Sequence, residues 1–128
     1  MINTINPVTE VVEARFEAHS SEQVEQKLQA AATAQREWAT TPLEQRLPLL
    51  RRVAQVLRDR KQEFAQLITL EMGKPIVEAE AEVEKCAVTC DFYAGNAKRF
   101  LDDLAVASNA SESAVVFDPL GIVLAIMP

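Results

Sequence analysis

The sequence is poor in glycine, histidine and aromatic residues, and each shortage excludes a class of site. Its 128 residues include three glycines and one histidine, and aromatic residues make up only 5%. Three scattered glycines cannot build a phosphate-cradling loop of the G-x-G-x-x-G or P-loop kind. Zinc centres need three or four cysteine, histidine or carboxylate ligands, and His19 lies far from both cysteines. We therefore expect neither a complete nucleotide-binding loop nor a metal site.

The chain also lacks long apolar runs, a leader pattern and positive charge. No apolar run approaches the roughly 20 residues that span a bilayer, and residues 1–7 lack the basic and apolar regions of a secretory signal. The net charge of −6 argues against nucleic acid and against an anionic membrane surface as partners. Two cysteines without a signal favour a reducing, cytoplasmic location.

The residues that are present favour a helical protein with an aliphatic core. Hydrophobic residues make up 48% of the chain, so with few aromatics the core must consist of aliphatic side chains and alanine. Residues 1–19 are expected to be extended, with an edge strand or hairpin arm over 8–16. Residues 20–104 are expected to form a helical layer, because apolar side chains recur there at helical spacing.

Capping signals mark three helices within this layer. Ser20 followed by Gln23 resembles a capping box at the start of the first helix. The second helix is expected to begin after Thr41, its N-cap, and to run to Gly73, which ends it in a left-handed conformation. Pro48 falls inside this span and could kink the first turn or move the start of the helix to about position 48. Pro75 is expected to open the third helix.

Two of these helices carry opposite charges. Residues 46–61 contain six basic residues against Asp59, whereas residues 71–84 contain five glutamates against Lys74. Because the link between the helices is short, we expect an antiparallel hairpin in which the basic and acidic sides face each other. The alternative is a phosphate-binding patch on the basic helix, but charge runs are usually solvated faces and no aromatics interleave here.

Cys86 and Cys90 stand one helical turn apart on the third helix. They could be half of a metal site or a redox pair, but the chain has no further cysteine. Helical spacing also disfavours a relaxed disulfide between them. Because free cysteine is among the most buried residue types, we predict that both cysteines lie in the core.

Two apolar segments close the chain. Residues 114–117 predict a strand, and residues 120–128 form a continuous apolar run that is typical of a central strand covered on both faces. A strand cannot satisfy its backbone groups alone. We therefore expect the 128 residues to be the front end of a larger α/β protein, with residues 114–128 entering its cofactor-binding sheet.

Several stretches, in a fixed order and at fixed intervals, resemble the NAD(P)-dependent aldehyde dehydrogenase family. The run Cys90-Asp91-Phe92-Tyr93 and the Ile-Met-Pro ending are most similar to its bacterial succinate-semialdehyde dehydrogenase branch. The resembling stretches are Thr41-Pro42-Leu43-Glu44-Gln45-Arg46, Leu70-Glu71-Met72-Gly73-Lys74-Pro75 with Glu78-Ala79-Glu80-Ala81-Glu82-Val83, Phe92-Tyr93-Ala94-Gly95, and Pro119-Leu120-Gly121-Ile122-Val123 with Ala125-Ile126-Met127-Pro128.

The resemblance implies the fold and chemistry of a longer parent protein. Its fold is α/β, with a helical N-terminal layer that leads into a Rossmann-type cofactor domain. The parent enzyme oxidises an aldehyde, with succinate semialdehyde as the candidate substrate, to the carboxylic acid with NAD or NADP. A cysteine thiolate attacks the aldehyde, hydride passes to the cofactor, and a glutamate-activated water hydrolyses the thioester. The intact enzyme is expected to be a homo-oligomer.

Few functional positions of the family fall within this chain. The resemblance implies that Ile126, Met127 and Pro128 form the strand end beside the cofactor. The family continues there as Trp-Asn-Phe-Pro, whose asparagine binds the developing oxyanion. That asparagine, the nucleophilic cysteine and the general-base glutamate have no counterpart here, and neither Cys86 nor Cys90 matches the nucleophile. We therefore expect no catalytic residue, no metal ligand and no activity in the chain alone.

Two alternatives remain open at the level of the sequence. The chain could be a non-catalytic helical association module derived from the family, since apolar stripes and unpaired strands seek partners. It could also be one part of a split enzyme that is completed by a separately encoded chain.

Overall fold

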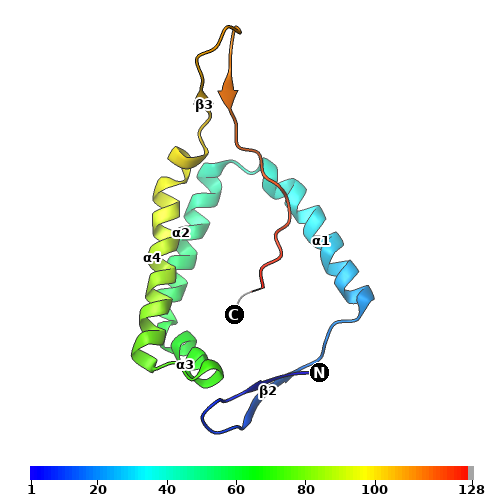
Figure 1. The fold of residues 1–128 in the computed structure, drawn as a ribbon, viewed down its shortest axis with the longest axis vertical. Helices are drawn as coiled ribbons and strands as arrows, with labels where there is room; N and C mark the ends of the chain where they lie inside the picture. Colours follow the sequence, from blue (N-terminus) through cyan, green and yellow to red (C-terminus); the bar gives the residue numbers. More distant parts are fainter. Residues whose placement is uncertain (127–128) are drawn as a thin grey trace.

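The computed structural model describes residues 1–126 as an open, mostly helical molecule (Figure 1). Three helices lie together on one side, whereas the first helix stands apart and the terminal segment, residues 119–126, runs between them. Along the chain the elements are β1 (Ile2–Ile5), β2 (Val12–Phe16), α1 (Ser21–Thr40), α2 (Leu43–Asp59), α3 (Lys61–Met72), α4 (Ile76–Leu101), β3 (Leu104–Ala105) and β4 (Ala114–Val115).

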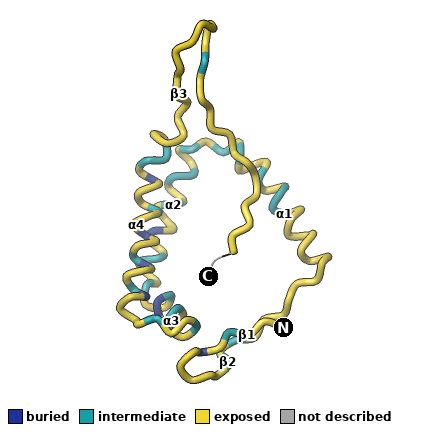
Figure 2. Tube along the Cα trace, viewed as in Figure 1, coloured by how far each residue is buried: buried dark blue, intermediate teal, exposed yellow. Residues whose placement is uncertain are grey.

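The core of the molecule lies along α4, which packs against both α2 and α3. Figure 2 shows that burial is concentrated in these helices. Small side chains allow the helices to approach closely, and this confirms the prediction of an alanine-rich aliphatic core. The buried apolar residues are Ala54, Ala65, Ala79, Val83, Ala87 and Ala94.

Charged contacts fix the antiparallel pairing of α2 with α4. Arg58 Nε donates to Glu84 Oε1 at 2.9 Å, and Arg58 Nη1 lies 2.8 Å from Asp91 Oδ2. Arg51 Nη2 donates to the carbonyl oxygen of Ala94 at 3.2 Å. The predicted hairpin with facing basic and acidic sides is therefore confirmed. The alternative of a phosphate-binding patch gains no support, because Arg58 is engaged by two carboxylates.

Replacing Arg58 with glutamine is expected to lower the melting temperature by a small, salt-dependent amount. Both ion pairs are partly exposed, and about 1 M salt shortens the screening length to roughly 3 Å. The difference between Arg58→Gln and the wild type should therefore shrink in high salt. Arg52→Gln is the matched control, because Arg52 forms no ion pair within residues 1–126. An equal melting-temperature loss in both variants at low salt would contradict the assignment.

The capping signals of α1 and α3 are confirmed. Ser20 Oγ accepts from the backbone N–H of Gln23 at 3.2 Å, and Gln23 Oε1 accepts from the backbone N–H of Ser20 at 2.9 Å, which completes the capping box. Gly73 ends α3 in the left-handed region with a φ of 70°. The third predicted cap was wrong: the Thr41 hydroxyl donates to the carbonyl oxygen of Glu37, so Thr41 ends α1 and does not start α2.

The prediction of one helix that runs to Gly73 was also wrong. At Arg60 the backbone leaves the helical region, with φ −107° and ψ 19°, and separates α2 from α3. In Figure 1, α3 turns away from the line of α2 at this point. The turn places α3 on α4 with Ala65 fully buried, so tertiary packing overrides the continuous apolar stripe.

The N-terminal region forms a hairpin, as predicted, whereas the predicted terminal strand does not form. β1 and β2 pair antiparallel, with Ile2 opposite Phe16. The other predicted strand survives only as β4, which pairs with β3. Residues 116–126 have no regular structure, and Leu120 and Leu124 are largely exposed. A strand needs backbone partners, and this segment has none within the described residues.

Candidate functional site

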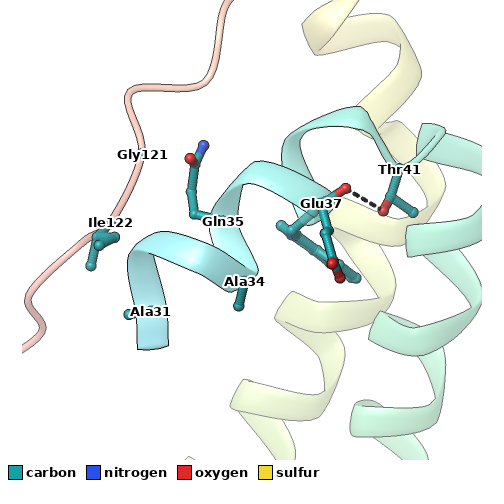
Figure 3. Close-up of a pocket in the computed structure, with 8 residues that line it drawn as sticks. Ala31, Ala34, Gln35, Glu37, Thr41, Gly121 and Ile122 are labelled. Atoms are coloured by element: carbon teal, nitrogen blue, oxygen red, sulfur yellow. Dashed lines mark hydrogen bonds between the residues drawn. The ribbon is translucent and has the colours of Figure 1, made fainter. Parts of the chain in front are cut away.

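The terminal segment passes beside α1 and forms a shallow cleft with it (Figure 3). The capping box fixes the start of α1, and helical spacing then brings Ala31, Gln35 and Trp38 to one side of the helix, where they line the cleft. The cleft has a volume of about 570 Å³. Its lining residues are Ala31, Ala34, Gln35, Glu37, Trp38, Thr41, Gly121 and Ile122.

This cleft is suited to contact with apolar groups, and Glu37 is the one ionisable residue that lines it. Trp38 remains 48% exposed and no residue of α1 is buried. The Thr41 hydroxyl is used by the carbonyl oxygen of Glu37, at 3.1 Å. The lining contains no cysteine, histidine or lysine that could act as nucleophile or proton carrier.

The residues predicted to border the cofactor do not assemble a cofactor site within the described part of the chain. Ile126 is 84% exposed, whereas Met127 and Pro128 lie outside the described residues. Gly121 has a positive φ of 111°, but no atom beyond its chain neighbours lies within 4 Å of where its Cβ would be. Within residues 1–126, the segment that contains Gly121 and Ile126 is therefore open to solvent on the side where the resemblance implies a cofactor.

The two cysteines are not in the core, so that prediction was wrong. Cys86 is exposed and Cys90 is half-buried. The buried face of α4 is carried by Ala79, Val83 and Ala87, and Cys86 lies outside it. Across residues 1–126 no three histidine, cysteine, aspartate or glutamate side chains gather to hold a metal ion.

The shifted pKa values belong to the ion pairs between α2 and α4 and to the ion pair at the start of α3. Side-chain hydrogen bonds to Glu84 and Asp91 raise the pKa of Arg58. The hydrogen bond from Arg60 lowers the pKa of the Glu63 carboxyl below its ordinary value, and the guanidinium of Arg60 lies over the Phe64 ring. None of these groups lines the cleft, so the shifted pKa values reflect contacts that stabilise the helices.

Sequence reasoning missed the cleft that α1 and the terminal segment line together. The apolar stripe on α1, from Val24 to Trp38, was visible in the sequence, but nothing in it identified a partner. His19, the only histidine of the sequence, is exposed just before the Ser20 cap and does not line this cleft. None of the helices formed by residues 1–126 is long and apolar enough to cross a membrane.

Comparison with known proteins gives one consistent result. A family model described as "Aldehyde dehydrogenase family" matches residues 1–128. The probable succinate-semialdehyde dehydrogenase [NADP(+)] of Synechocystis is 45% identical over 99% of this chain, which covers 28% of that protein. Succinate semialdehyde dehydrogenase [NAD(P)+] Sad of Escherichia coli is 38% identical over 98% of this chain, which covers 27% of that protein.

A solved structure agrees with these sequence matches. Succinic semialdehyde dehydrogenase from Streptococcus pyogenes, solved with NADP+, superposes with a TM-score of 0.81 and 31% identity, over 86% of this chain and 24% of that one. The fold is therefore that of the N-terminal helical region of an α/β dehydrogenase. The chain belongs to the aldehyde dehydrogenase family, and it spans between a quarter and a third of the length of the relatives it matches.

Proposed function

We propose that this chain is the N-terminal part of an oxidoreductase that oxidises an aldehyde to the carboxylic acid with NAD or NADP. Succinate semialdehyde is the proposed substrate, and a cysteine thioester formed elsewhere in the enzyme is the proposed intermediate. The observation that carries the proposal is that succinate-semialdehyde dehydrogenases match nearly the whole chain while the chain covers only about a quarter of them.

The exposed surface of the chain supports this role. The described structure exposes 10456 Å², whereas a compact monomer of this mass exposes about 6,800 Å². Side chains that would be buried in a compact fold are open to solvent, among them Trp38 and Leu124. Within the longer enzyme, we propose that residues 114–128 enter the cofactor-binding sheet and that Ile126, Met127 and Pro128 run beside the cofactor.

The purified 128-residue chain is expected to form no NADH or NADPH from succinate semialdehyde above the rate without protein. The reason is that three scattered glycines build no phosphate-cradling loop and that neither cysteine matches the nucleophile of the family. The measurement is the absorbance of reduced nicotinamide with each cofactor in turn. Aldehyde-dependent reduction by the pure chain, lost when its two cysteines are replaced, would contradict the proposal.

A second candidate function is a non-catalytic association module, and the open α1 surface favours it. No residue of α1 is buried and its Trp38 is half exposed. Such a module would assemble into a defined oligomer in the micromolar range, with Trp38→Ser weakening the assembly. Sedimentation distinguishes the two functions, because only the association module requires the isolated chain to form an oligomer of one defined size. Under the first proposal, it is the intact enzyme that forms a homo-oligomer, and not this chain by itself.

A further inference from the structure

Both cysteines of the chain line one groove beside α4. The groove has a volume of about 750 Å³. Cys86 is exposed and Cys90 is half-buried, so both residues lie outside the core. Neither thiol has a role in the proposed aldehyde oxidation. The groove is lined by Lys74, Glu78, Ala81, Glu82, Lys85, Cys86, Thr89 and Cys90.

The helical spacing of the two thiols favours a bridging atom over a direct bond. Residues four apart on a helix have Cβ atoms about 5–6 Å apart, whereas a relaxed disulfide needs about 3.5–4.5 Å. Metal–sulfur bonds of about 2.3 Å place two sulfurs roughly 4.6 Å apart across one linearly bound ion. Cys86 and Cys90 therefore suit a single ion held between them better than a disulfide.

The ligand count selects the kind of ion. Zinc takes four ligands in structural sites, and residues 1–126 bring no third histidine, cysteine or carboxylate into a metal-holding group. Soft thiolate ligands suit Cu(I), zinc and iron–sulfur clusters, and structural zinc and iron–sulfur sites take four protein ligands. Two thiolates without further ligands therefore suit Cu(I), a soft monovalent cation. We propose that Cys86 and Cys90 bind one monovalent thiophilic cation of the Cu(I) type.

The groove carries two positive and two negative side chains, Lys74 and Lys85 against Glu78 and Glu82, and Lys85 is the one adjacent to a thiol in the chain. Each thiol releases its proton and no electron is transferred, so two thiolates and one monovalent cation leave a net charge of −1. Lys85 precedes Cys86, lines the same groove and forms no ion pair within residues 1–126. Lys74 also lines the groove, although it is paired with Glu82. A neighbouring ammonium group stabilises the negatively charged complex.

Anaerobic titration of the reduced 128-residue chain with Cu(I), against a coloured Cu(I) chelator, tests the proposal. We expect one ion per chain and two protons released per ion. Cys86→Ser and Cys90→Ser should each weaken binding about 100-fold or more, because the second thiol acts at a high effective concentration. Retention of wild-type affinity in either variant would overturn the proposal.

The matched control keeps two thiols and changes only their spacing. Cys90→Ser combined with Val88→Cys places the thiols two residues apart, where helical side chains do not face each other, and Val88 is exposed. This double variant should bind as weakly as the single variants, with unchanged circular dichroism. Wild-type affinity in the double variant would overturn the proposal. X-ray absorption of the wild-type complex, which needs no variant, should show two sulfur ligands, and three or four would also overturn it.

Discussion

Replacing Gly73 with alanine is expected to destabilise the chain by at least roughly 1–2 kcal/mol, the cost of a left-handed conformation for a residue with a Cβ. Gly73 ends α3 with a φ of 70°. The added Cβ would also lie 2.9 Å from Cγ of Pro7, in the loop between β1 and β2. Two penalties therefore act at one position. The free energy of unfolding in urea, followed by circular dichroism, measures their sum.

Gly95→Ala is the control, and it is expected to change the free energy of unfolding in the opposite direction. Gly95 lies in the interior of α4, and no atom beyond its own stretch of helix lies within 4 Å of the position that an added methyl group would take. Alanine there should stabilise the helix by roughly 0.5–1 kcal/mol. Pro7→Gly in the Gly73→Ala background removes the proline ring. It should recover only the part of the lost stability that comes from the clash with Pro7. If both glycine replacements shift stability in the same direction, the account of Gly73 is contradicted.

Replacing Ala87 with leucine is expected to destabilise the chain by about 1–3 kcal/mol, the typical cost of forcing a larger side chain into a closed interface. Ala87 is fully buried on α4. The interface between the helices depends on alanines on both sides, including Ala54 of α2 and Ala65 of α3. The side chains that are fully buried among residues 1–126 are alanines, so the extra atoms of leucine would have to push the helices apart. Urea unfolding again supplies the measurement.

Ala81→Leu is the matched control for Ala87→Leu. Ala81 lies on the same helix but is exposed, and leucine is nearly as good a helix former as alanine. The control should leave the free energy of unfolding almost unchanged. An equal loss in the two variants would show that the cost does not come from packing between helices.

Local signals in the sequence predicted local structure well. The Ser20–Gln23 capping box and the left-handed Gly73 both depend only on residues a few positions apart, and both are confirmed. The helix break at Arg60 has no such signal, because neither glycine nor proline stands there. It follows from how α3 packs on α4, which is a tertiary effect that propensity cannot report.

The candidate site was harder to predict because its features depend on what covers each surface. The general preference of cysteine for burial failed at Cys86, since that side of α4 is open in this structure. The apolar run before Ile126 predicts a strand, but it has no partner among the described residues and lies exposed. Membership of the family, by contrast, follows from motifs spread along the whole chain, and the family match confirms it.

The central claim is that this chain supplies the N-terminal part of a succinate-semialdehyde-oxidising enzyme. The most direct test is a hybrid in which the chain replaces the matching 127 residues of the Synechocystis relative, to which it is 45% identical. The account predicts that the hybrid reduces NADP+ in the presence of succinate semialdehyde, within about tenfold of the parent enzyme's kcat/KM, which corresponds to about 1.4 kcal/mol of transition-state stabilisation. A folded hybrid with the parent's oligomeric state but no aldehyde-dependent reduction would contradict it.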